Sequence, residues 1–225
     1  MKLKLNSVSL SVTQYLRNQI VTGQLLPGQK LNEVALSSDL EISRPPLREA
    51  FRVLEAENLV LAIPRRGAFV TELNSDDFRE VAEAREMIEV CAINLIRDKN
   101  IKDLAVIASS IVETERFPEP GARANPEEKL RYLCCFAGFH RAIVAAAGNF
   151  RLKEFYEKLS SSLLRYQYRY FYKSMDRRRF KVEHHAILKA LESGAYDEAK
   201  ELLRKHITYG FETPVELEPL NGVAR

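Results

Sequence analysis

The sequence predicts a mainly α-helical fold in two parts: a small N-terminal domain with a β-hairpin, and an all-helical C-terminal bundle of six to seven helices. Short helical patterns separated by turn signals fill the first part, and one stretch near its end, "LVLAIPRRGAFVTE", has the pattern of two strands around a turn. Long helical patterns with short breaks follow. This change of pattern assigns residues 1–73 to the first domain and residues 74–225 to the second.

The composition is that of an ordinary soluble globular protein, with 46% hydrophobic and 29% charged residues among 225. The net charge is only +3, so any nucleic-acid surface must come from local clustering of basic residues. No apolar run approaches the ~18 to 20 residues that span a bilayer, and the N-terminus has no signal-peptide core. The three cysteines lack CxxC spacing and are typical of reduced thiols. We therefore expect a cytoplasmic protein without a membrane segment.

The N-terminal pattern contains three successive helices. The first runs from about Ser7 to Thr22 and ends at Gly23, which suits a left-handed C-cap. A short helix follows over residues 33–40. After a tight turn, Ser43 is placed to cap a longer helix that begins near Arg44. Two prolines occupy the first turn of that helix, where a missing amide hydrogen costs nothing.

The longer helix has an apolar face and a basic face. Arg44, Arg48 and Arg52 are spaced four residues apart and form a stripe about 110° from the apolar face. A short helix, a tight turn and a helix with an exposed arginine stripe are the layout of a helix-turn-helix. Its arginines can donate bidentate hydrogen bonds to guanine edges or charge-assisted bonds to phosphates. The apolar residues are Leu47, Ala50, Phe51 and Leu54.

The predicted hairpin carries two arginines at its tip. Arg65 and Arg66 occupy the turn, and Gly67 permits a positive φ there. A basic hairpin tip beside a recognition helix is a wing, which reaches the minor groove or the backbone of DNA. The alternative is a solvated basic helix and hairpin that bind no nucleic acid. The order of helix, turn, basic helix and basic wing favours DNA binding.

Residues 20–70, "IVTGQLLPGQKLNEVALSSDLEISRPPLREAFRVLEAENLVLAIPRRGAFV", resemble the N-terminal signature of GntR-family bacterial transcription regulators. The resemblance implies DNA contacts from Arg44 and Arg48 on the recognition helix and from Arg66 and Gly67 in the wing. It does not extend to Val34, where some members of the FadR branch have an arginine. The candidate DNA-contacting residues are therefore Ser43, Arg44, Arg48, Arg52, Arg65, Arg66 and Gly67.

The C-terminal stretches "EAREMIE", "FHRAIVAAAGN" and "EHHAILKALESGAYDEAKELLRKHI" resemble, in order and spacing, the FCD ligand-binding domain of the FadR branch. Breaks in the helical pattern fall near residues 98–100, 117–128, 147–149, 174–176 and 193–196. The resemblance therefore implies a helical domain that binds a small-molecule effector and dimerises.

Three of the four histidines lie on inward-facing stripes of three different helices: His140, His184 and His206. His185 is rotated about 100° from its neighbour and should point to a flank. Imidazoles that converge from separate helices make a divalent-metal site with open coordination positions, suited to Zn²⁺ or Ni²⁺. The alternative is a metal-free pocket in which the histidines bind the effector or pack.

The resemblance supports a metal site, but the sequence departs from the family pattern at one position. Metal-binding FCD domains have an Asp-x-x-x-His pattern on one helix and two later histidines. The three inward histidines match that pattern, but Phe136 stands at the aspartate position. The loss of that carboxylate removes one ligand and one charge from the predicted site.

Arg85 shares the inward stripe of the first C-terminal helix. A buried guanidinium needs an anion. Glu89, four residues later, is one candidate and an effector carboxylate is the other; the resemblance places the family's ligand cavity nearby. The candidate effector-binding residues are Arg85, His140, His184 and His206.

These features predict a ligand-responsive transcription repressor. We expect a homodimer that binds a pseudo-palindromic operator in double-stranded DNA and responds to a small organic acid. The alternative is a metal-free regulator with a larger apolar or acyl-type effector, which Phe136 favours. A three-histidine metal hydrolase is disfavoured because the sequence has no HExxH or GxSxG motif, so we expect no enzyme.

Overall fold

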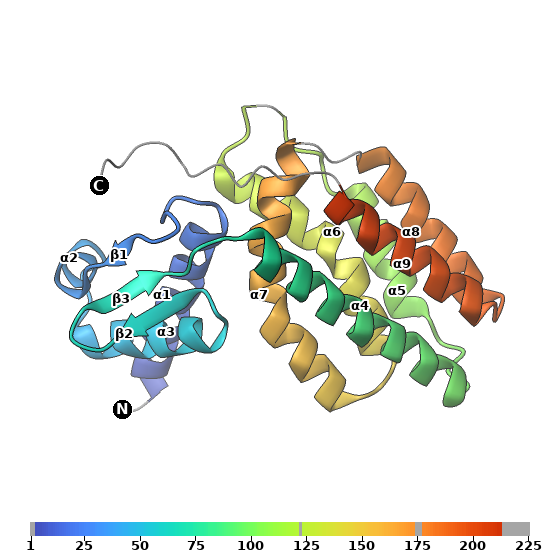
Figure 1. Cartoon of the computed structure of the whole chain (residues 1–225), viewed down its shortest axis with the longest axis horizontal. Helices are drawn as coiled ribbons and strands as arrows, with labels where there is room; N and C mark the ends of the chain where they lie inside the picture. The colour runs from blue at the N-terminus through green and yellow to red at the C-terminus, as the bar shows by residue number, and fades with distance from the viewer. Residues whose placement is uncertain (1–2, 122, 174–176, 213–225) are drawn as a thin grey trace. The chain divides into compact units, whose positions relative to one another are not determined.

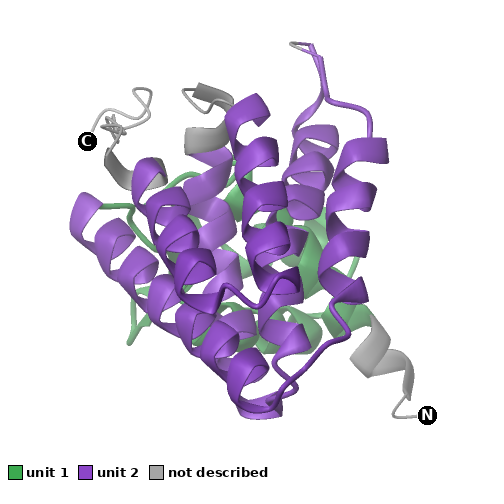
Figure 2. Cartoon of the chain, turned by 90° about the vertical axis from the view of Figure 1, so that its right-hand side faces the viewer, with its two compact units in different colours: residues 1–74, 217–225 green, residues 75–216 purple. Residues whose placement is uncertain are grey.

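A computed structural model of the chain describes residues 3–121, 123–173 and 177–212, and side chains over slightly shorter ranges. The described residues form two compact units that divide between Asn74 and Ser75, shown in two colours in Figure 2. The first unit combines helices with a small sheet, and the second is helical throughout its described residues. The predicted mainly α-helical fold class is confirmed.

The first unit contains three helices and a three-stranded antiparallel sheet with the strand order β1-β3-β2 (Figure 1). Its elements are α1 (Leu3–Val21), β1 (Lys30–Leu31), α2 (Glu33–Asp39), α3 (Arg44–Ala56), β2 (Val60–Ile63) and β3 (Gly67–Val70). The hairpin of β2 and β3 follows the prediction. Strand β1 was not predicted, because a strand of two residues is too short to show alternation.

The core of the first unit lies between α1, α3 and the sheet. The apolar face of α3 is buried as its spacing predicts, and Leu47 and Leu54 are fully enclosed against Leu16 of α1. Burial of each such leucine contributes about 1.5–3 kcal/mol. The opposite face of α3 stays exposed to solvent, so the arginine stripe is available to a ligand.

The helix ends of the first unit agree with the sequence in part. Gly23 has a φ of 76° and ends α1 in the left-handed conformation, as predicted. Ser43 occupies the N-cap position of α3 with an extended backbone, but its side chain makes no capping hydrogen bond. The predicted side-chain cap is therefore wrong at Ser43. Asn32 does cap α2, because its side chain accepts from the amides of Val34 and Ala35.

Six helices make up the described part of the second unit, within the predicted range of six to seven (Figure 1). They are α4 (Ser75–Asp98), α5 (Ala105–Arg116), α6 (Pro126–Ala146), α7 (Phe150–Lys173), α8 (Arg177–Glu192) and α9 (Tyr196–Glu212). The predicted break over residues 174–176 lies outside the described residues. Helix α4 packs against α6, α7 and α9, and α8 packs against α9 and α5. This arrangement lets α4 reach the same core as α6 and α9.

The apolar stripes of these helices close the bundle. Helix α6 begins with a capping box between Asn125 and Glu128, with Pro126 in its first turn. Its inward residues Phe139 and Ile143 are fully buried. None of the described helices is long and apolar enough to cross a membrane.

Candidate functional site

The exposed face of α3 carries the predicted arginine stripe. Arg48 donates from Nε to Glu33 Oε2 at 2.9 Å, and Arg52 lies 3.5 Å from the carboxylate of Glu49. Exposed ion pairs of this kind contribute at most about 1 kcal/mol. A phosphate or a guanine edge can therefore replace these carboxylates at little cost. Arg44 lies in the first turn of α3 and is also exposed.

The β2–β3 turn forms the predicted wing. Arg65 and Gly67 have positive φ angles of 64° and 101°, and the Arg66 guanidinium lies 5.7 Å from the centre of the Phe69 ring. A groove of about 650 Å³ separates α3 from this hairpin, and Arg48, Arg52 and Arg65 line it. Acidic residues line it as well, so its charge is mixed. The fold thus brings Arg48 and Arg52 of the helix and Arg65 of the wing to one concave surface.

The three inward histidines converge in the core of the second unit. They come from α6, α8 and α9, and each is at most 3% exposed. His206 Nε2 lies 3.1 Å from His140 Nε2 and 3.3 Å from His184 Nε2. The ligating atoms of all three lie within 4.8 Å of one another. His185 instead points to the flank predicted for it, with Nε2 2.7 Å from Glu115.

Two carboxylates contact the Nδ1 atoms of His140 and His206, on the side of each ring away from the cluster. Glu89 Oε2 lies 2.7 Å from His140 Nδ1, and Glu183 Oε2 lies 2.8 Å from His206 Nδ1. An ionised carboxylate only accepts hydrogen bonds, so each Nδ1 must be the donor. The neutral rings therefore present the bare lone pairs of Nε2 to the centre of the cluster. This second layer of contacts is typical of metal-bound histidines.

The resulting arrangement calls for an electrophile between the rings. His184 can donate a hydrogen bond to one lone pair of the cluster, but His140 and His206 still face each other as two acceptors 3.1 Å apart. A divalent cation relieves this repulsion. Tetrahedral Zn²⁺ with Zn–N bonds of about 2.0–2.1 Å places its ligand nitrogens about 3.3–3.4 Å apart. The observed separations of 3.1 and 3.3 Å match this spacing for the two pairs that include His206, whereas the three ligating atoms together extend over 4.8 Å and would have to close around one ion.

Burial favours the neutral form of all three rings. Desolvation lowers the pKa of His140 and of His184 well below the usual value. It also lowers the pKa of His206, although the hydrogen bond with Glu183 opposes that shift. Neutral imidazoles are the form that coordinates metals.

Arg85 and Glu89 form a buried pair beside the histidines. Arg85 Nε donates to Glu89 Oε1 at 2.7 Å, and the two residues are 5% and 0% exposed. Burial raises the pKa of Glu89, and the charge of Arg85 opposes the rise. Burial also raises the pKa of Tyr156, which interacts with both groups. Within the described residues, Arg85 Nη2 is buried and has no hydrogen-bond partner.

Arg85 can therefore pair with Glu89 and still donate to an effector carboxylate. Glu89 takes one edge of the guanidinium, and the Nη2 hydrogens remain for a second acceptor. A buried donor left without a partner costs about 1–3 kcal/mol. This cost favours a ligand that supplies an oxygen to Arg85.

Phe136 lies against the histidine cluster, where the resemblance leads one to expect an aspartate. It is 4% exposed, and its ring centre lies 5.0 Å from that of His184. Phe139 stacks on the same histidine, with the two ring centres 4.0 Å apart. In the described part of the chain, the metal-compatible group contains three imidazoles and no carboxylate.

Glu183 and the contact of Glu89 with His140 were not predicted from the sequence. Glu89 is recognisable as a helical neighbour of Arg85, but its contact with His140 joins residues 51 positions apart. Glu183 directly precedes His184, yet its carboxylate reaches His206 on the next helix. The sequence signal for Glu89 was an acidic residue on the inward-facing stripe of its helix, where it needs a polar partner.

The fold and these two surfaces define a winged helix-turn-helix transcription regulator with an all-helical C-terminal domain. The chain belongs to the GntR family of bacterial regulatory proteins: the family model covers residues 8–70, and the model of the FCD domain covers residues 80–209. Since members of this family regulate transcription, the protein is a DNA-binding regulator and not an enzyme.

Individual relatives agree with this assignment. The chain is 30% identical to the HTH-type regulator YdhC of Bacillus subtilis. The match covers 64% of this chain and 63% of YdhC, so the chain spans less than two thirds of that relative. It is 28% identical to the HTH-type transcriptional repressor GlaR of Escherichia coli, over 88% of this chain and 92% of GlaR. It is 26% identical to the regulator LutR of B. subtilis, over 84% and 93% of the two chains.

Solved structures share the fold. A GntR regulator from Rhodococcus sp. RHA1 aligns with a TM-score of 0.73 at 23% identity, over 92% of this chain and 96% of that one. McbR/YncC of E. coli aligns with a TM-score of 0.70 at 22% identity, over 91% and 95%.

Proposed function

We propose that the protein is a metal-dependent, ligand-responsive transcription repressor. The observation that carries the proposal is the convergence of three Nε2 atoms, two of which face each other as acceptors at 3.1 Å. His140, His184 and His206 would hold Zn²⁺ or Ni²⁺, with coordination positions left for other ligands. The name of the relative GlaR, a repressor, supports repression as the sign of regulation.

The proposed effector is a small organic acid. A divalent cation on three neutral imidazoles leaves a buried positive charge that the described ligands do not balance, because Glu89 already pairs with Arg85. A metal ion supplies a Lewis-acidic centre that binds carboxylate oxygens. Arg85 Nη2 is a second donor for the same anion. Phe136 offers an apolar surface to the rest of the effector.

On DNA, the proposed form is a cytoplasmic homodimer on a pseudo-palindromic operator. Each half-site would receive one α3 helix, with contacts from Ser43, Arg44, Arg48 and Arg52, and one wing, with contacts from Arg65, Arg66 and Gly67. The effector acts only if it binds one arrangement of the dimer more tightly than the other.

Two measurements on the purified full-length chain test the proposal. Elemental analysis is expected to find about one Zn or Ni per chain, and His140→Ala should abolish it. Titration calorimetry with a panel of small carboxylates should then detect binding by the metal-loaded protein, which a chelator removes. A chain that neither retains nor binds these metals at micromolar concentration contradicts the metal site.

A metal-free regulator with an apolar or acyl-type effector is the second candidate. The aromatic ring of Phe136 at the predicted aspartate position favours it. Acyl-chain binding that is equal with and without chelator would support this candidate and count against the first.

A further inference from the structure

A shallow hollow of about 520 Å³ lies between α5, α6 and the start of α7, and we call it the α5–α6 face. Small side chains from α6 form its floor, and they follow one helical stripe at spacings of four, four and three residues. Because the distance between packed helices depends on the side chains at the contact, this floor allows close approach of another helix. The stripe consists of Cys134, Gly138, Ala142 and Ala145.

One exposed aliphatic residue of α5 lines this face. Val106 is 48% exposed and belongs to the hollow, whereas Val112 lines a neighbouring hollow on another side of α5. Val106 beside a floor of small residues gives the centre of the face an apolar surface suited to a protein contact.

Opposite charges occupy the two ends of the face. The Thr114 hydroxyl donates to the Cys135 carbonyl at 2.9 Å, which places Glu113 level with the Cys134 end of the stripe. Lys153 also lines the hollow, in the first turn of α7, which follows shortly after the Ala145 end of α6. Its neighbour Arg141 is already paired with Glu157 at 3.0 Å. Neither Glu113 nor Lys153 belongs to an ion pair within the described residues.

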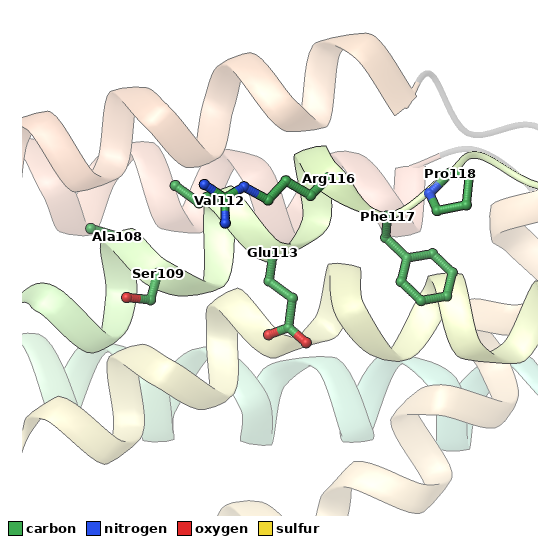
Figure 3. Close-up of a pocket in the computed structure, with 7 residues that line it drawn as sticks. All are labelled: Ala108, Ser109, Val112, Glu113, Arg116, Phe117 and Pro118. Atoms are coloured by element: carbon green, nitrogen blue, oxygen red, sulfur yellow. The ribbon is translucent and has the colours of Figure 1, made fainter.

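The side chain of Glu113 points toward α6 and not along α5. Figure 3 shows its carboxylate on the α6 side of the helix, while Arg116 extends along the opposite side. Glu113 lines both this hollow and a second one formed by Val112, Phe117 and Pro118. The acid therefore stands at the rim of the α5–α6 face, where a partner can reach it.

We propose that the α5–α6 face is the surface through which two copies of this chain associate. A two-fold axis brings the same patch of each copy together, so each residue meets a different residue of its mate. An acid at one end and a base at the other are self-complementary under that operation. Glu113 of each copy then pairs with Lys153 of the partner, and the small stripes pack at the centre. This inference rests on the homodimer of the proposed function.

Charge reversal on the full-length chain tests the pairing. Sedimentation velocity should find the wild type as a dimer, and Glu113→Lys and Lys153→Glu should each raise the dimer dissociation constant by about tenfold or more, since every substitution acts twice across the axis. The double variant Glu113→Lys with Lys153→Glu reverses both charges and should restore the constant to within about threefold of the wild type. High salt should weaken all of these differences.

Matched variants off the face serve as controls. Lys158→Glu on α7 and Glu127→Lys on α6 make the same charge changes at exposed positions and should leave the dimer unchanged. A dimeric wild type that is insensitive to both single variants overturns the assignment of the face but leaves the homodimer standing. A monomeric wild type overturns both. Failure of the double variant to recover the dimer shows that Glu113 and Lys153 do not pair.

Discussion

At the scale of single residues, Glu89 and Glu183 contact two of the histidines and should influence metal binding. Glu183 Oε2 lies 2.8 Å from His206 Nδ1, and its side chain is 23% exposed, so it can be changed with little damage to the core. Glu89 is a poorer target, because its loss leaves the Arg85 charge buried without compensation. Glu183 fixes the tautomer of His206 that points a lone pair into the cluster, so its replacement should affect metal binding more than folding.

We expect Glu183→Gln to lower the affinity for Ni²⁺ or Co²⁺ by about 10–100-fold, as other second-layer substitutions do. The amide no longer requires His206 Nδ1 to be the donor, so the ring loses its fixed tautomer. Competition with a chromophoric chelator measures the affinity. Glu86→Gln is the control. Glu86 lies on α4 and pairs with Arg204 of α9, so this variant loses an ion pair outside the histidine cluster and should bind metal like the wild type. Equal affinities for the two variants would contradict the role of Glu183.

Phe136→Asp should tighten metal binding, because it restores a carboxylate beside the three imidazoles. The same change removes a buried ring and should cost the metal-free protein about 3–5 kcal/mol of unfolding free energy. Denaturant unfolding with and without Zn²⁺ measures both effects. Phe136→Ala separates them: it should lose the stability without the gain in affinity. If both variants bind metal alike, the ring does not occupy a ligand position.

At the scale of elements, α3 and the wing should make different contributions to DNA binding. Arg48 lies on the recognition helix, and Arg66 lies at the hairpin tip. A base-edge contact is worth about 1–3 kcal/mol of discrimination, whereas a phosphate contact mainly sets the salt dependence.

Arg48→Ala is therefore expected to weaken operator binding by about 5–150-fold and to relax sequence preference. Arg66→Ala should weaken binding to all sequences and make the plot of log K against log salt shallower by about one unit. Fluorescence anisotropy over a range of salt concentrations checks both. Arg79→Ala, an exposed arginine on α4, is the control. Identical behaviour of the α3 and wing variants would contradict this division.

At the scale of the whole molecule, metal should protect the helices that hold it. The histidines lie on α6, α8 and α9, all within the second compact unit. Metal at 100 times its dissociation constant stabilises the bound state by about 2.7 kcal/mol. We expect amide exchange in these three helices to slow by up to about 100-fold, with no such effect in α3. Hydrogen-exchange mass spectrometry measures this, and protection that persists in His140→Ala would contradict it.

Much of the fold is readable from periodicity alone. The stripe that buries Leu54 also exposes Arg48, because one spacing assigns both faces of α3. The inward placement of the histidines follows in the same way. The two-residue strand β1 and the absent hydroxyl cap at Ser43 were not readable, since neither leaves a periodic signal.

Helical periodicity and residue chemistry are enough to predict the helical class, the basic recognition helix with its wing, and the inward position of three histidines. The packing of the helices then brings the Nε2 atoms to separations of 3.1 and 3.3 Å, joins Glu89 to His140, and sets Phe136 against His184. The physical reason is that spacing along a helix decides which face is buried. Which buried faces meet, and which ring nitrogen points inward, depends on the crossing of helices and on contacts distant in sequence.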